Sequence, residues 1–207
     1  MRIGIFGGTF DPIHNAHCFV AESARTLERL ERVLFVPTGN GHYRDKPQTS
    51  APHRCAMILG AIESNPAFAL DDTDLRENAT GYTADLLPRL HAKYPGSNFT
   101  FIIGADSLAS ANWVRLDEVI EGLERFAIAP RAGVRADALA RVIDAVSPAL
   151  RDRITTLNLP ELPESASLVR SLLSQGRSVR YLVPEPVWRY ITAHRLYGLG
   201  ESDGSNS

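Results

Sequence analysis

The 207-residue sequence has little cysteine, no block of like charge and no long apolar run. Cys18 and Cys55 are too few for a disulfide framework, and residues 1–6 lead into a strand-like run rather than a signal peptide. We therefore expect a cytoplasmic protein. The 22 Lys and Arg residues against 24 Asp and Glu residues give a net charge of −2, which disfavours nucleic acid or an anionic membrane as a partner. No apolar stretch approaches the roughly 20 residues that cross a bilayer, which argues against an integral membrane protein.

Short β-branched and aromatic runs alternate with helical patterns along a chain that is 44% hydrophobic. This alternation predicts an α/β fold, with a Rossmann-like, open, mainly parallel sheet and helices on both faces. We expect a single domain over residues 1–197 and a flexible tail over residues 198–207. Strands are expected at residues 3–6, 33–36, 68–70, 99–103, 125–129 and 154–159. Helices are expected from about residue 14 to 27, after Ser50, and at residues 82–91, 134–146, 165–174 and 186–193.

The loop after the first expected strand is the best candidate for an anion-binding site. Gly7 and Gly8 let backbone amides approach a phosphate closely, and the helix that follows adds its positive N-terminal end. Thr9 and Phe10 would contribute amides to the same loop. The segment is neither a Walker A loop nor a spaced-glycine dinucleotide motif, so the two commonest nucleotide-binding signatures are missing.

His14 and His17 lie three residues apart at the expected helix start, so both imidazoles would face one ligand. Ring N–H groups in that position can stabilise the negative charge that grows on oxygens during phosphoryl transfer. One alternative is a capping histidine next to a surface histidine. Another is a metal site that also uses Cys18 or Cys55, although no further ligand cluster with usual zinc spacing is evident.

Residues 8–17 resemble the Gly-x-Phe-Asp-Pro-x-His-x-Gly-His signature of a nucleotidyltransferase superfamily, and within it the bacterial nicotinate mononucleotide adenylyltransferases. Residues 165–170 are similar to the triphosphate-binding Ser-Ser-Thr-x-Ile-Arg segment of that family. The resemblance runs from about residue 2 to residue 197. It implies that His14, His17 and Arg170 are catalytic. It also assigns ATP contacts in this region to Gly7, Gly8, Thr9, Phe10, Ser165 and Ser167.

Three further segments resemble the parts of the family that bind ribose and the acceptor. Residues 81–85 are similar to a Ser-Tyr-Thr-x-Asp segment, which implies that Tyr82 and Thr83 hold the pyridine carboxylate. Gly104 and Asp106 would meet the ribose of ATP, because a carboxylate can accept hydrogen bonds from both ribose hydroxyls. Trp113 resembles a tryptophan that stacks on the nicotinate ring, although burial in the core is an alternative role for its indole.

The sequence departs from the family pattern at several positions. Ala16 replaces the glycine between the histidines, and Gly81 stands where serine is common. The basic segment after the second strand is replaced by residues 41–46, in which Arg44 is the expected phosphate ligand. The spacing from Gly104 to Trp113 is one residue shorter than the family pattern. The last departure and Gly81 both fall in the segments that the resemblance assigns to the acceptor pocket.

The resemblance implies that the chain transfers the adenylyl group of ATP to nicotinate mononucleotide and releases pyrophosphate. Mg²⁺ would be bound mainly through ATP or pyrophosphate oxygens, with few or no protein ligands. Rival hypotheses are transfer of an adenylyl or cytidylyl group to nicotinamide mononucleotide, phosphopantetheine or a sugar phosphate, and a nucleotide sensor without activity. A dehydrogenase is disfavoured by the missing glycine spacing. The sequence leaves open whether the protein forms a homo-oligomer.

Overall fold

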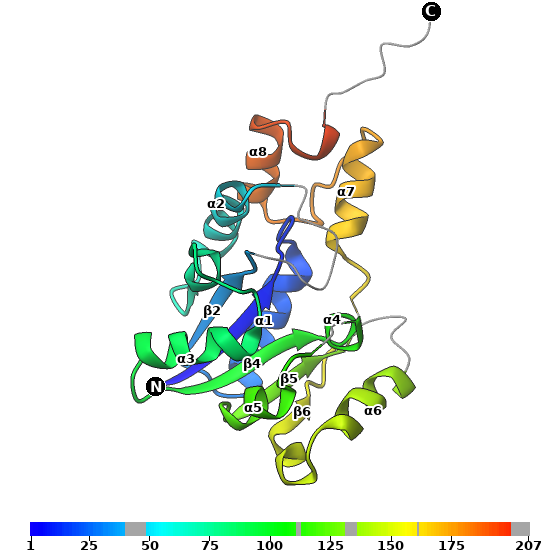
Figure 1. Ribbon diagram of the computed structural model, residues 1–207. Coiled ribbons are helices and arrows are strands. Elements are labelled where there is room, and N and C mark those ends of the chain that lie inside the picture. Colours follow the sequence, from blue (N-terminus) through cyan, green and yellow to red (C-terminus); the bar gives the residue numbers. More distant parts are fainter. Residues whose placement is uncertain (40–48, 111–112, 131–135, 161, 200–207) are drawn as a thin grey trace, which may run out of the picture.

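A computed structural model describes residues 1–39, 49–110, 113–130, 136–160 and 162–199 (Figure 1). Six parallel strands form one open sheet in the order β3-β2-β1-β4-β5-β6. This arrangement confirms the predicted Rossmann-like α/β fold. The strands are β1 (Arg2–Gly8), β2 (Arg32–Pro37), β3 (Phe68–Leu70), β4 (Asn98–Gly104), β5 (Arg125–Ala129) and β6 (Ile154–Thr156).

Helices follow most of the strands, as expected for parallel strands that need crossover connections. The α-helices are α1 (Asn15–Leu27), α2 (Ala51–Ile62), α3 (Thr83–Lys93), α4 (Ala105–Ser110), α5 (Leu116–Glu121), α6 (Ala136–Ala145), α7 (Ala166–Ser174) and α8 (Glu185–Ala193). Short 3-10 helices are η1 (Thr73–Leu75), η2 (Pro148–Arg153) and η3 (Leu196–Gly198). No helix among these described segments is long and apolar enough to span a bilayer.

Two details of the predicted elements need correction. The last strand ends at Thr156 rather than at residue 159, because the Leu159 N–H donates to the Leu157 carbonyl 3.0 Å away in a tight turn that takes the chain off the sheet. The sequence analysis did not anticipate α4 and α5, which have six residues each and are too short to show a helical repeat of apolar residues.

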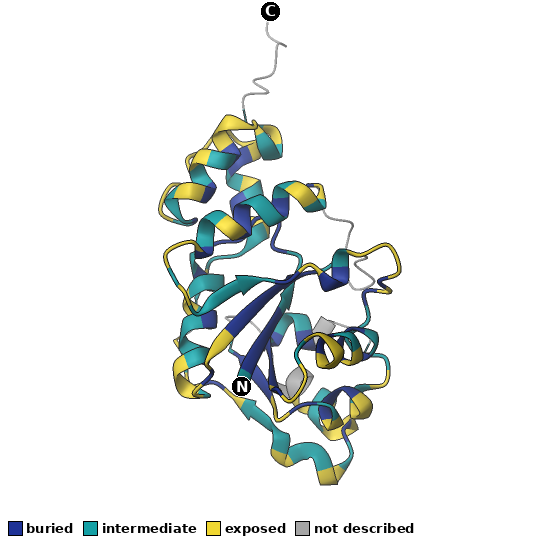
Figure 2. Ribbon diagram, turned by 90° about the vertical axis from the view of Figure 1, so that its left-hand side faces the viewer, coloured by how far each residue is buried: buried dark blue, intermediate teal, exposed yellow. Residues whose placement is uncertain are grey.

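Apolar side chains alternate between the two faces of the sheet and form a core on each. On β1, Ile3 and Ile5 face the core that contains α3, α4 and α5, whereas Phe6 faces the core that contains α1, α2, α7 and α8. Figure 1 shows α3 and α5 in front of the sheet and α1 behind it. In Figure 2 the central strands are buried and the outward helix faces are exposed. This two-sided burial explains the almost uninterrupted apolar composition of β2 and β4.

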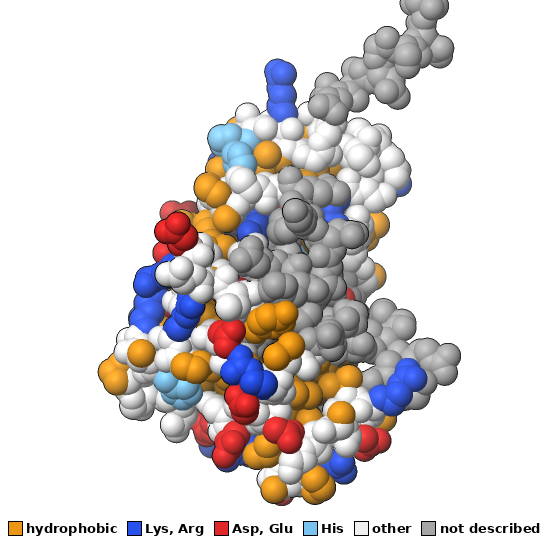
Figure 3. Space-filling model, viewed as in Figure 1, with side chains coloured by type: hydrophobic (Ala, Val, Ile, Leu, Met, Phe, Trp, Pro, Cys, Tyr) orange, Lys and Arg blue, Asp and Glu red, His pale blue; other side chains and the backbone are white. Residues whose placement is uncertain are grey.

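Charged side chains of both signs lie interspersed on the surface. On the lower part of the face in Figure 3, Lys and Arg side chains lie next to Asp and Glu side chains. Surface ion pairs such as Arg2 with Glu124 (3.2 Å) and Arg189 with Glu185 (3.1 Å) fit this distribution and the net charge of −2.

Helix α2 provides a direct test of the packing. Ile58 is completely buried in the core between α2 and the sheet, whereas its neighbour Leu59 is 53% exposed. We expect Ile58→Ala to lower the free energy of unfolding by about 2–5 kcal/mol, because it leaves a cavity. Leu59→Ala should change it by less than about 0.5 kcal/mol. Urea unfolding measures both, and equal losses would contradict the position of α2.

Candidate functional site

A cavity of about 610 Å³ lies at the carboxyl end of the sheet, where β1 pairs with β2 on one side and β4 on the other. After β1 the chain continues to β2 on one side of the sheet, and after β4 it continues to β5 on the other side. The two connections diverge, which opens a crevice between them at this point of an open α/β sheet. The cavity is lined from β1, α1 and α7 on one side and from α3, β4 and α4 on the other. The lining includes Gly7, Gly8, Thr9, Phe10, His14, His17, Thr83, Gly104, Asp106, Trp113, Ser165, Ser167 and Arg170.

The loop between β1 and α1 has a constrained backbone. Phe10 has a φ of 49°, in the left-handed region, which costs a residue other than glycine about 1–2 kcal/mol. Its ring is 2% exposed and packs against Phe6 and Phe35, with centroids 5.5 and 5.7 Å apart. A Cβ on Gly8 would lie 3.2 Å from the Phe10 ring, so a small residue is needed beneath it. The apolar anchor holds the loop backbone in this conformation at the cavity wall.

His14 and His17 face the cavity together, as the sequence predicted. Their ring centroids are 3.7 Å apart, and His14 is 1% exposed at the N-cap of α1. The His14 backbone N–H donates to His17 Nδ1 at 3.2 Å, which leaves the ring proton of neutral His17 on Nε2. His14 is the N-cap of α1, as the capping alternative expects, while His17 is partly buried and combines a local hydrogen bond with a place in the cavity wall.

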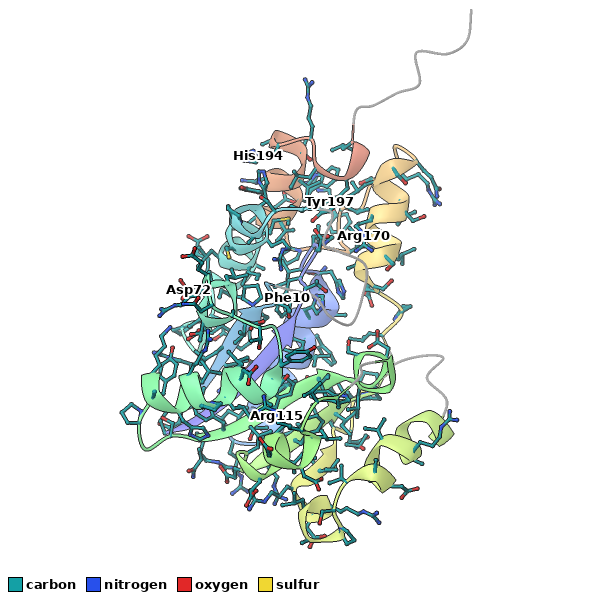
Figure 4. All side chains as sticks on the ribbon, in the orientation of Figure 1. Phe10, Asp72, Arg115, Arg170, His194 and Tyr197 are labelled. Carbon is teal, nitrogen blue, oxygen red and sulfur yellow. The ribbon has the colours of Figure 1, made fainter. Side chains whose placement is uncertain are left out.

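Arg170 comes from α7 and meets the same loop. Its Nη1 donates to the Asp11 carbonyl at 2.7 Å and its Nη2 donates to Ser167 Oγ at 3.3 Å. Ser165 caps α7, since its Oγ accepts from the Leu168 N–H at 3.0 Å. The positive end of α7 and the Arg170 guanidinium thus lie together on the cavity wall. Figure 4 shows Arg170 and Phe10 close to each other beyond the end of β1.

Behind the loop, three residues form a buried polar group that the sequence analysis did not single out. The Tyr197 hydroxyl donates to Asp11 Oδ1 at 2.7 Å, and both residues are largely buried. Burial and the Asp11 charge raise the pKa of Tyr197 well above its usual range, so Tyr197 stays a donor. Arg54 of α2 is 2% exposed and donates to the Thr9 carbonyl at 2.6 Å and to the Thr38 carbonyl at 3.0 Å.

One sequence signal could have revealed Arg54. Arg54, Met57 and Ile58 are spaced at i, i+3 and i+4, which places the arginine on the buried stripe of its helix. A cation at an apolar position of that kind needs buried acceptors, and here backbone carbonyls provide them. Tyr197 carried no comparable signal, because it lies after the last helix in a short 3-10 turn.

The opposite wall contains the residues expected to bind ribose and the acceptor. A Cβ on Gly104 would lie 2.8 Å from Asp106 Oδ1, so a side chain at the strand end would displace this carboxylate from its present position at the cavity. Trp113 lines the cavity while its indole also packs edge-on against Phe126 (5.6 Å), and its Nε1 donates to the Leu108 carbonyl at 3.2 Å. The ring therefore contacts the core and borders the cavity, and its stacking on a nicotinate ring stays a prediction.

Helix α3 begins at the same wall. Thr83 at its first turn and Gly81 before it line the cavity, but Tyr82 is not among the lining residues of the described chain. The Tyr82 N–H donates to Thr80 Oγ1 at 3.2 Å.

Ala16, the departure between the histidines, is 7% exposed and its methyl group borders the cavity. Arg44, the remaining predicted phosphate ligand, lies outside the described residues.

The alternative of a protein-bound metal receives no support from the described side chains. Within residues 1–39, 49–110, 113–130, 136–160 and 162–199, no three His, Cys, Asp or Glu side chains could hold a metal ion together. Burial raises the pKa of the Cys18 thiol to about 11, so the thiolate that a metal requires is unfavourable there.

The chain is similar to known proteins over most of its length. Residues 5–171 match the cytidylyltransferase-like family. A probable nicotinate-nucleotide adenylyltransferase of Symbiobacterium thermophilum is 39% identical over 205 residues, covering 98% of each chain. A protein of the same description from Thermomicrobium roseum is 39% identical over 198 residues, covering 95% of this chain and 91% of the relative.

Among solved structures, a Plasmodium falciparum nicotinic acid mononucleotide adenylyltransferase complexed with NaAD has a TM-score of 0.77 at 21% identity, over 97% of this chain and 99% of that one. This likeness supports the fold. The family match and the sequence relatives lead to one assignment: the chain belongs to the cytidylyltransferase-like family and, within it, to the nicotinate-nucleotide adenylyltransferases.

Proposed function

We propose that the chain transfers the adenylyl group of ATP to nicotinate mononucleotide, giving nicotinate adenine dinucleotide and pyrophosphate in NAD biosynthesis. The observation that carries this proposal is the convergence of His14, His17 and Arg170 on one cavity that Trp113 and Thr83 border from the other side. Cations and ring N–H donors on one wall suit a triphosphate, and an aromatic ring beside a helix start suits a pyridine ring with its carboxylate.

The reaction needs no protein nucleophile, because the acceptor already carries an anionic phosphate. One phosphate oxygen attacks the α-phosphorus of ATP in line, a new P–O bond forms, and the bond to the β-phosphate oxygen breaks. The protein has to hold two polyanions together and stabilise the charge of the departing pyrophosphate. The backbone amides of Gly8, Thr9 and Phe10 would orient phosphate oxygens, and His17 Nε2–H would donate toward the transferring group.

The remaining assignments combine the cavity lining with the family resemblance, on which those of Arg44 and Tyr82 rest alone. Arg170 and Ser167 would hold the leaving pyrophosphate, with Arg44 as a further cation in the proposed site. Asp106 would accept hydrogen bonds from ribose hydroxyls, and Tyr82 with Thr83 would hold the pyridine carboxylate at the start of α3. Mg²⁺, when bound, neutralises phosphate charge, and its ligands would be mainly phosphate oxygens. We expect the protein to act in the cytoplasm.

A panel of acceptors tests the proposal. Pyrophosphate release is measured from ATP, and separately from CTP, with nicotinate mononucleotide, nicotinamide mononucleotide, phosphopantetheine and a sugar phosphate. We expect ATP with nicotinate mononucleotide to give the highest kcat/KM, since the start of α3 favours a carboxylate. A higher kcat/KM with another acceptor would replace the assigned substrate. Binding of ATP without product from any acceptor would indicate a nucleotide sensor.

His17→Ala tests the role of the paired imidazoles. We expect kcat to fall about 10²–10³-fold with little change in thermal stability, because one donor toward the developing charge is lost. His53→Ala is a matched control, since His53 is a partly buried histidine that bonds to the Tyr190 hydroxyl (3.0 Å) and does not line the cavity. Steady-state kinetics compare the two variants with the parent protein, and unaltered turnover of His17→Ala would refute the assignment.

Trp113→Ala tests the acceptor side independently. Loss of the ring that borders the cavity should raise the KM for nicotinate mononucleotide about tenfold, while the KM for ATP stays within about twofold. Trp113→Phe keeps an aromatic face and should recover most of the affinity. If both substrates lost affinity equally, Trp113 would have a packing role only.

A further inference from the structure

Arg54 is a buried cation that contacts the loop between β1 and α1 from outside the cavity. It is 2% exposed and is not among the described residues that line the cavity. Its Nη1 and Nη2 donate to the carbonyls of Thr9 and Thr38, which do line the cavity. The guanidinium therefore lies behind two backbone segments whose other sides face the cavity.

The hydrogen bond to Thr9 fixes the direction of the next amide. The Thr9–Phe10 peptide bond is trans, so its carbonyl and its N–H point in opposite directions in one plane. Because Arg54 binds the Thr9 carbonyl from behind, the Phe10 N–H is directed to the opposite side. Phe10 has a φ of 49°, a conformation that a residue with a Cβ adopts only when its surroundings impose it. Arg54 supplies part of that constraint.

The second hydrogen bond joins the loop to the neighbouring strand end. The Thr38 N–H donates to the Gly8 carbonyl at 2.9 Å, and the Thr38 carbonyl accepts from Arg54 at 3.0 Å. The planar donor fork thus holds the backbone after β1 and after β2 in one fixed relation. A lysine in this place would have a single ammonium group and no planar fork.

Charge adds to this geometric role. Burial lowers the pKa of Arg54 and the Asp11 carboxylate acts in the opposite direction, yet a guanidinium remains protonated at neutral pH. The acceptors that the described part of the chain offers the guanidinium, the Thr9 and Thr38 carbonyls, are neutral. Its positive charge therefore contributes to the field on the phosphate side of the cavity.

We infer that Arg54 is a positioning residue for ATP, which holds the Thr9 and Thr38 carbonyls so that the loop amides face the phosphates. This inference rests on the proposed function, since it assumes that ATP phosphates occupy the wall beside His14 and His17. It predicts that Arg54 affects ATP more than nicotinate mononucleotide, because its contacts lie on the side of the cavity opposite Thr83 and Trp113.

The test compares Arg54→Met, Arg54→Lys and Met57→Ala. Met57 is completely buried on the same face of α2, so its truncation destabilises the same helix without removing the guanidinium that binds the Thr9 and Thr38 carbonyls. Chemical unfolding gives the folded fraction of each variant, and kinetics are expressed per folded molecule. Arg54→Met should lower kcat/KM for ATP about 100-fold, as expected for misplaced binding groups, with the KM for nicotinate mononucleotide within about twofold. Arg54→Lys should recover less than about a tenth of this loss, and Met57→Ala should keep the parental values.

Titration with MgATP alone provides a second readout. We expect weaker binding in both Arg54 variants and unchanged binding in Met57→Ala. If Arg54→Met does not fold, Arg54→Lys carries the comparison. Parental kcat/KM and MgATP affinity in a folded Arg54 variant, or an equal loss in Met57→Ala, would overturn the inference. If the parent protein binds MgATP but releases no pyrophosphate, the proposed function fails, while the titration still tests Arg54.

Discussion

The loop after β1 is held by two arginines that approach it from different helices, and the proposed phosphate site depends on this arrangement. Arg54 of α2 binds the Thr9 carbonyl at 2.6 Å, and Arg170 of α7 binds the Asp11 carbonyl at 2.7 Å. Phe10, between these two anchors, adopts a left-handed backbone conformation. A flexible loop would lose entropy each time it bound a phosphate, whereas a loop ordered in advance has already lost that freedom during folding.

The same anchors couple the site to the assembly of the whole fold. Arg170 lies 159 residues from Asp11 along the chain, and Tyr197 lies 186 residues from it. Contacts over such separations form only when the sheet has brought β1 beside β4 and the C-terminal helices have packed on their core. The loop after β1 therefore reaches its final structure only when α7 and the residues after α8 have packed beside it. Arg170 and Tyr197 then bind Asp11 of this loop, although they are far from it in sequence.

The sequence was sufficient for the features that repeat or that belong to local motifs. Alternating apolar runs and helical patterns predicted all six strands, because parallel strands buried on both faces need apolar residues throughout. The glycine loop and its histidines were found as a motif. Arg54 and Tyr197 were not found, since their importance lies in the backbone carbonyl or carboxylate that they contact, and those partners are distant in sequence. The short helices α4 and α5 were missed because six residues are too few for a periodic pattern.

The acceptor side of the cavity is held together by a separate set of contacts. Asp85 in the first turn of α3 forms an ion pair with Arg115, and its other oxygen accepts from the Thr80 hydroxyl at 2.6 Å. Arg115, which has a φ of 53°, follows Trp113 by two residues, so the pair ties the tryptophan segment to the start of α3. Both ion-pair partners are about one-third or more exposed, which makes the bridge worth less than a buried contact. The acceptor wall is thus tied by a partly exposed ion pair, whereas the loop on the opposite wall is held by the buried donor Arg54 and the partly buried Arg170. A mutation of Asp85 or Arg115 should therefore disturb its wall less than a mutation of Arg54 disturbs the loop.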